Sequence, residues 1–186
     1  MDPITRLQES IDQTRSIVAA LDASDLGQTT PCTEWDVESL ANHLFGALVM
    51  FRDVATLGAA DMGAAETDHH HGNLLEVYDT LTTATVEAWQ AEGRVDGVAN
   101  MPWGQMPAEI ALQVLADDIV VHGWDFATAT GQQIDWDQVL AAETLEFAQM
   151  IFSDPDARAG SFADAVPVAE DADAMTRLVT FLGRHV

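Results

Sequence analysis

The chain has 186 residues, a length that suits one domain with a short appendage and that can bury a substantial core without disulfides. It carries 31 acidic residues against seven basic ones, all of them arginine, and the resulting net charge of −24 argues against binding to nucleic acid or to anionic membranes. The single cysteine, Cys32, excludes an internal disulfide and a cysteine-based zinc cluster.

The N-terminal residues, MDPITRLQESID, lack the basic start and the apolar run of a signal peptide. No apolar stretch approaches the roughly 18 to 20 residues that a membrane span needs. The acidic residues are scattered and do not form runs, which indicates a solvated surface. We therefore expect a cytoplasmic protein.

Helix signals dominate the chain, and strand signals are nearly absent. Asp2 and Pro3 predict the cap and the first residue of a helix whose apolar residues then follow on one stripe. The run SDLGQTTPCTEW, residues 24–35, contains a glycine and a proline and ends this helix. A second helix is predicted to begin after Asp36 and to extend to about residue 54.

Two loops and two further helices are predicted in the middle of the chain. Residues 58–72 are small and polar and indicate a loop, and a third helix is expected over about 73–92. A second loop contains GVANMPWGQMP, residues 97–107. Pro107 is predicted to open a fourth helix and Gly131 to close it.

The C-terminal part is predicted to hold a fifth helix near 137–152 and a last helix over about 171–183. In the connection between them, FADAVPV (162–168) could form a short extended segment. Four amphipathic helices joined by loops predict an all-α antiparallel bundle. We expect the bundle over residues 1–132 and, over 133–186, a short helical extension packed on it as part of a single domain. Any apolar face that the extension leaves uncovered would favour a homodimer.

A charged pair interrupts the apolar stripe of the fourth predicted helix. Ile110, Val114, Asp118 and His122 follow one another at steps of four residues and therefore share a face of the helix. An unpaired carboxylate on a core-facing stripe costs several kcal/mol, so either an ion pair or a metal ion has to compensate it. His43, on the second helix, is also expected to face inward.

A carboxylate and an imidazole one turn apart, joined by a second imidazole from a facing helix, form a set of three metal ligands. Such a set leaves a fourth position for water or substrate. Taken alone, the spacing of Asp118 and His122 is more often that of a structural ion pair than that of a metal site.

Three blocks of the sequence resemble a known family. TPCTEWDVESLANHLFG (30–46) is similar to the tPc-x-W-x-v-x-x-L-x-x-H-l-x-g opening of the mycothiol-dependent maleylpyruvate isomerase N-terminal domain, in the DinB-like superfamily. DDIVVHGWDFATATGQ (117–132) resembles the D-x-v-v-H-g-W-D-l-A-x-A-t-G-q segment of that family. FADAVPVAEDADAMTRLVTFLGR (162–184) is similar to the C-terminal tail of an actinobacterial branch.

This resemblance implies a DinB-like up-down four-helix bundle that holds a divalent metal between its helices, with His43, Asp118 and His122 as the ligands. It implies zinc as the ion, with nickel, iron and manganese as alternatives. It also implies a mycothiol-like low-molecular-weight thiol as cosubstrate and an electrophilic small molecule as substrate. The characterised isomerase has glutamate in place of Asp118 and a larger C-terminal domain, so its maleylpyruvate activity is not carried over. Family members that keep the three ligands and act on other substrates are regarded as thiol S-transferases.

We therefore expect a metal-dependent thiol S-transferase or isomerase. One alternative is a non-catalytic helical module that binds a metal or a ligand. Another is a metal-dependent hydrolase in which Asp125 acts as the base, which makes Asp125 the candidate catalytic residue. Asp125 could equally orient a ligand histidine or cap the backbone.

Several further residues are candidates for binding or packing. Arg52 could bind an anionic thiol or a substrate carboxylate, although a surface ion pair is the more common role for such an arginine, and Trp103 could line the thiol pocket. Asp117 points about 100° away from Asp118 around the helix axis and is therefore expected to be solvated. The consecutive histidines 69–71 are expected to lie in a solvated loop.

Three residues of the first two blocks that resemble the family are expected to be structural. Trp35 and Trp124 are predicted to anchor the core. Cys32 precedes a helix cap in a turn and has no histidine near it in the sequence, so it is predicted to be a small, half-buried apolar side chain.

Overall fold

The computed structural model describes residues 1–33, 35–69, 72–154, 158 and 162–186. The chain divides into two compact units, Met1–Gln132 and Gln133–Val186. Over the described residues, every helix is too short or too polar to cross a membrane.

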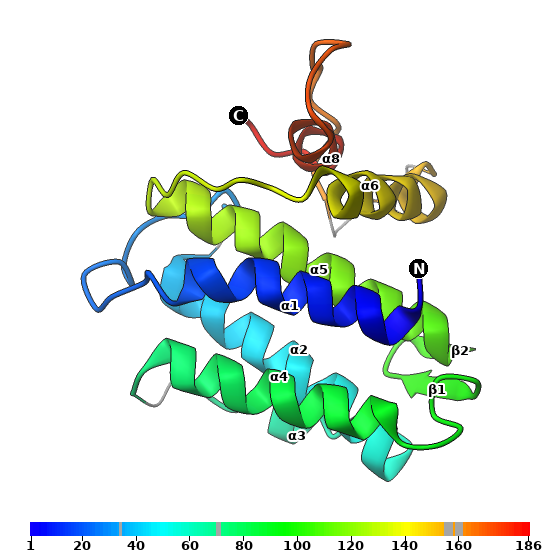
Figure 1. The fold of residues 1–186 in the computed structure, drawn as a ribbon. Coiled ribbons are helices and arrows are strands. Elements are labelled where there is room, and N and C mark those ends of the chain that lie inside the picture. The colour runs from blue at the N-terminus through cyan, green and yellow to red at the C-terminus, as the bar shows by residue number, and fades with distance from the viewer. Residues whose placement is uncertain (34, 70–71, 155–157, 159–161) are drawn as a thin grey trace. The chain divides into compact units, whose positions relative to one another are not determined.

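Four helices form the first unit as a bundle (Figure 1). α1 contacts α4 and α5, and α2 contacts the same two helices, so α1 and α2 lie diagonally across the bundle. This arrangement confirms the predicted all-α four-helix bundle. The four helices are α1 (Pro3–Val18), α2 (Val37–Leu57), α4 (Leu74–Gln90) and α5 (Ala108–Ala129).

Capping residues set the helix ends where the sequence predicts them. The carboxylate of Asp2 accepts hydrogen bonds from the first backbone N–H groups of α1, and Asp36 caps α2 by accepting from Ser39 N–H. Gly131 follows α5 with a φ of 68°, a conformation that glycine adopts without strain. Such caps each contribute about 1 kcal/mol, so they decide where a helix begins more than whether the bundle forms.

The helix directions do not simply alternate along the chain. Thr85 Oγ1 donates to the carbonyl of Leu48, and Trp89 Nε1 donates to the carbonyl of Phe51, so α2 and α4 advance together and run in the same direction. The connection from α2 to α4 is long enough to return to the starting end of α2, and it contains the four-residue helix α3 (Met62–Ala65) inside the predicted loop. The order is therefore up, down, down, up (Figure 1).

A β-hairpin precedes α5 in a segment predicted to be only a loop. β1 (Val98–Met101) pairs with β2 (Gly104–Pro107) in antiparallel register, with Met101 opposite Gly104. Ala99 and Met101 are buried, whereas the other two residues of β1 are exposed. Four-residue strands that contain alanine and asparagine carry little strand propensity, so the prediction missed them; buried alternate side chains stabilise the hairpin instead.

The described part of the second unit contains two helices, close to the predicted ranges, which pack on each other. α6 (Gln138–Phe152) and α8 (Ala174–Phe181) begin at the caps Asp137 and Asp173. Residues 162–168 form no strand.

Close packing of α1 on α5 generates a test of the fold. A methyl group added at Gly123 would lie 2.5 Å from Thr14 Oγ1, which is buried and donates to the carbonyl of Ile119. Gly123→Ala should therefore lower the free energy of unfolding by about 1 to 3 kcal/mol in urea denaturation, even though alanine favours a helix over glycine. The double variant with Thr14→Ala, which removes the clash, should lose less than the sum of the single variants. An additive double variant would contradict this packing.

Candidate metal centre

The three predicted ligands lie together between α2 and α5. Asp118 Oδ1 is 3.3 Å from His122 Nε2, and Asp118 Oδ2 is 3.7 Å from His43 Nε2. One donor atom from each of the three side chains lies within 4.8 Å of the other two. α5 supplies the carboxylate and one imidazole because residues four apart share a helix face, and α2 supplies the second imidazole.

This cluster is buried on one side and open on the other. The side chain of His122 is 8 % exposed, whereas those of Asp118 and His43 are 28 % and 36 % exposed. Asp118 Oδ2 itself is inaccessible and has no hydrogen-bond partner among the described residues. A buried carboxylate oxygen without a donor is costly. A cation at this position would satisfy it, so the donor set fits a divalent metal.

Asp125 faces the back of the cluster. It is fully buried, and its Oδ2 accepts a hydrogen bond of 2.9 Å from His122 Nδ1. This bond places the proton of the neutral imidazole on Nδ1 and turns the lone pair of Nε2 toward Asp118. The geometry thus favours the orienting role over that of a base, since the carboxylate does not reach the open side.

The electrostatics of the cluster follow from its burial and its charges. Burial alone would lower the pKa of His122, but the Asp118 carboxylate and hydrogen bonds with Asp118 and Asp125 outweigh it and raise the pKa to about 9. Burial alone would raise the pKa of Asp118, but His122 and then His43 hold it far below its usual range. Without a metal, the cluster is a buried ion pair.

A tryptophan covers the two imidazoles. The indole of Trp35 stacks on His43 with ring centroids 4.4 Å apart and an interplanar angle of 33°, and its centroid lies 6.0 Å from that of His122. Trp35 is half-buried at the cluster and is not the simple core anchor that we expected, whereas Trp124 is buried as predicted.

The two predicted thiol-binding residues do not lie at the cluster. Arg52 donates to Asp53 at 2.7 Å, and it follows His43 by nine residues, about 13 Å along α2. Trp103 is 56 % exposed at the turn of the hairpin, with its ring 6.4 Å from that of Phe51. The structure thus brings together His43, Asp118, His122 and Asp125 but not Arg52 or Trp103.

Asp117 is not solvated as predicted. Its side chain is 13 % exposed, and Oδ1 accepts a hydrogen bond of 2.9 Å from the buried Arg6. No local sequence pattern indicates this pair because Arg6 lies more than a hundred residues away, on α1, which packs on α5.

Cys32 also contacts the cluster, which the sequence did not predict. Its sulfur lies within 4.8 Å of a donor atom of His122 and of Asp125, and the side chain is half-buried. In the predicted histidine loop, His69 is half-buried rather than solvated: its N–H donates to Asn42, and its Nε2 lies 2.8 Å from the carbonyl of Ala64. His70 and His71 lie outside the described residues.

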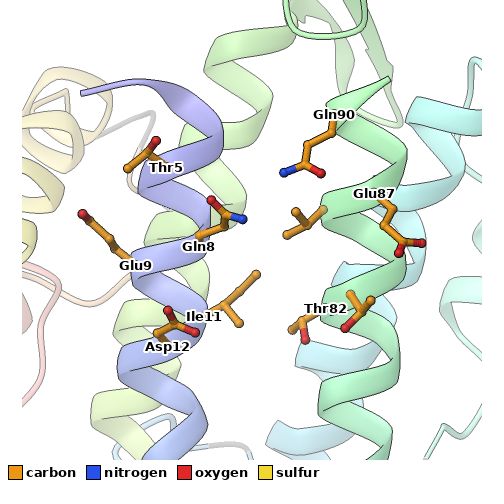
Figure 2. Close-up of a pocket in the computed structure, with 10 residues that line it drawn as sticks. Thr5, Gln8, Glu9, Ile11, Asp12, Thr82, Glu87 and Gln90 are labelled. Carbon is orange, nitrogen blue, oxygen red and sulfur yellow. The ribbon is translucent and has the colours of Figure 1, made fainter. Parts of the chain in front are cut away.

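A groove of about 570 Å³ lies between α1 and α4, where Gln8 and Gln90 extend toward each other (Figure 2). The residues that line it include Glu9, Asp12 and Glu87, no basic side chain and none of the three candidate ligands. Its negative charge disfavours an anionic ligand, and we place the candidate site at the cluster instead.

Comparison with known proteins identifies the family. Residues 7–127 match the model of the mycothiol maleylpyruvate isomerase N-terminal domain. The chain belongs to this family. Its resemblance to the family in sequence is thereby confirmed.

Relatives of full length and solved structures extend this result. Two proteins of Mycobacterium tuberculosis, from the strains CDC 1551 / Oshkosh and ATCC 25618 / H37Rv and both named as uncharacterized, are 28 % identical over 187 residues, covering 100 % of this chain and of theirs. The crystal structure of the mycothiol-dependent maleylpyruvate isomerase matches with a TM-score of 0.62 and 16 % identity, over 86 % of this chain and 72 % of that chain. A histidine-to-alanine variant of it matches with the same TM-score and identity, over 81 % and 70 %. At this identity, the match shows that the two proteins share a fold.

The ion pair predicts how the stability of the metal-free protein depends on pH. Because the folded pKa of His122 is raised from 6.5 to about 9, its contribution is fully present below pH 6.5 and is lost as the pH rises through 9. In EDTA, the free energy of unfolding should fall by on the order of 1 to 3 kcal/mol more between pH 6.5 and 9.5 in the parent than in His122→Asn. Urea denaturation at both pH values measures this, and equal losses in the two proteins would contradict it.

Proposed function

We propose that this protein is a divalent-metal-dependent enzyme that uses a mycothiol-like low-molecular-weight thiol to act on a small electrophilic substrate, as an S-transferase or an isomerase. The observation that carries the proposal is the convergence of His43, Asp118 and His122 within 4.8 Å of one another, with an inaccessible carboxylate oxygen that lacks a donor. Membership in a family named for a mycothiol-dependent isomerase supports the thiol.

The donor set selects the class of ion. Two imidazole nitrogens and one carboxylate oxygen suit zinc, and they also accommodate nickel, iron or manganese. A soft site would need thiolates, and a calcium or magnesium site would need more oxygens. Zinc is therefore the first ion to test.

Three protein donors and a half-exposed rim leave room for an exogenous ligand. The side chains of His43 and Asp118 are the accessible members of the cluster, so a ligand would approach past them. A divalent ion held there would supply a positive charge that favours the thiolate form of a coordinating thiol. The hydrogen bond from His122 Nδ1 to the buried Asp125 keeps His122 Nε2 turned toward the position that an ion would share with His43 and Asp118. The buried side of the cluster excludes water.

The alternative functions require a different geometry. A purely structural metal site would be closed by a fourth protein ligand. Among the described residues, His43, Asp118 and His122 form a group of three, and Cys32 groups with His122 and Asp125 rather than with His43 and Asp118. A hydrolase would need a carboxylate near the open position, and Asp125 is fully buried behind His122.

Metal binding is tested with tag-free protein prepared without metal. The parent should bind one zinc ion in isothermal titration calorimetry, and His122→Ala should bind it at least about 100-fold more weakly because a ligand is lost. The matched control replaces the histidines at 69–71 with alanine, which should leave the affinity of the cluster unchanged. A parent that binds no zinc, or zinc that is lost only with the loop histidines, would refute the proposal.

Binding of the thiol is tested with cobalt in place of zinc. Mycothiol should add a sulfur-to-cobalt charge-transfer band to the near-ultraviolet spectrum of the cobalt-loaded parent because its thiolate enters the coordination sphere. S-methylated mycothiol, which cannot form a thiolate, should leave the spectrum unchanged. The thiol arm of the proposal fails if the two compounds act alike.

A further inference from the structure

The two imidazoles of the candidate centre are held in different ways. His122 is oriented by a hydrogen bond from Nδ1 to the buried Asp125. His43, by contrast, has no hydrogen bond of ordinary length to the described residues, since its Nε2 lies 3.7 Å from Asp118 Oδ2. The centroid of its ring lies 4.4 Å from that of Trp35 and 5.0 Å from that of His122.

An imidazole that binds a metal usually donates its second ring N–H to a partner, which fixes the orientation of the ring. The side chain of His43 is 36 % exposed, so packing alone encloses it only in part. The two rings are tilted by 33° with their centroids only 4.4 Å apart, which is closer to a stacked than to an edge-on arrangement. Stacking therefore limits the rotation of His43 where a hydrogen bond would otherwise do so.

The loop before α2 holds Trp35 in place. The carbonyl of Trp35 accepts from Thr30 Oγ1 at 2.8 Å and from Thr30 N–H at 3.3 Å, and the Trp35 N–H donates to the carbonyl of Cys32 at 2.8 Å. Thr30 is buried, and Asp36 caps the helix immediately after the tryptophan. The backbone N–H and carbonyl of Trp35 are thus both held by hydrogen bonds, which gives the indole a fixed position from which to restrain His43.

We propose that Trp35 is a positioning residue, whose stacked indole holds His43 with Nε2 turned toward Asp118 in readiness for a divalent ion. This inference rests on the proposed function, since it assigns Trp35 a role at the same metal centre. Asp125 and Trp35 then perform the same task for the two histidines, one by a buried hydrogen bond and the other by ring stacking.

The test compares Trp35→Ala with Trp35→Phe. Losing the stacked ring should weaken zinc binding by about three- to tenfold in Trp35→Ala, and phenylalanine, which keeps an aromatic face, should restore most of the affinity. In the cobalt-loaded proteins, the visible spectrum of Trp35→Ala should differ from that of the parent because His43 is less firmly oriented, and that of Trp35→Phe should resemble the parent.

Trp89→Phe serves as the control for general loosening of the bundle. Trp89 is buried on α4, and its indole N–H donates to the carbonyl of Phe51, so this variant should lower the melting temperature without changing the zinc affinity. A second readout needs no metal: in NMR spectra of the metal-free parent, the ring protons of His43 should be shifted upfield by the indole, and Trp35→Ala should remove this shift.

The outcomes separate the two proposals. If the parent binds zinc and Trp35→Ala binds it equally well with an unchanged cobalt spectrum, the role of Trp35 is refuted and the proposed function stands. Equal weakening by Trp35→Phe and Trp35→Ala, or weakening by Trp89→Phe as well, also refutes the positioning role. If the parent binds no zinc, both proposals fall.

Discussion

The candidate centre depends on one constraint: the negative charge of the Asp118 carboxylate, which lies between the packed helices α2 and α5, has to be balanced by positive charge. An ionised group in this position is costly unless opposite charge surrounds it, and the two imidazoles beside it supply that charge when protonated. A divalent cation would supply the charge instead and would also engage the oxygen that has no donor. The same arrangement is therefore a buried ion pair in the metal-free protein and a set of metal ligands in the function that we propose.

Helix packing creates this arrangement. α2 and α5 contact each other directly, so His43 comes to face two residues of α5 that are about 75 and 79 positions later in the chain. Gly123 lets α1 approach the other side of α5, where Thr14 occupies the space that a Cβ would fill. The glycine and the aspartate that follow His122 thus have distinct tasks: Gly123 allows close helix contact, and Asp125 orients the imidazole.

Local signals predicted most of the helical framework and the members of the cluster. Asp2, Asp36 and Gly131 mark helix ends because capping depends on residues close in sequence. The spacing of Asp118 and His122 placed them on one face for the same reason. The hairpin before α5 was missed, since its short strands are stabilised by burial of Ala99 and Met101 rather than by propensity. Asp117 was wrongly expected to be solvated because nothing near it in sequence indicates Arg6.

The sequence by itself determined the helices, their caps and the residue types able to hold a metal, because these follow from periodicity and from side-chain chemistry over a few positions. Only the tertiary structure decided that α2 and α4 run in the same direction, that Asp125 lies behind His122, that Trp35 lies against His43 and that Cys32 lies near His122. Some of these contacts join residues far apart in the chain, and others involve residues in loops. In neither case does a periodic sequence pattern indicate the contact. They depend on which helix faces meet, and that choice is made by the packing of the whole bundle.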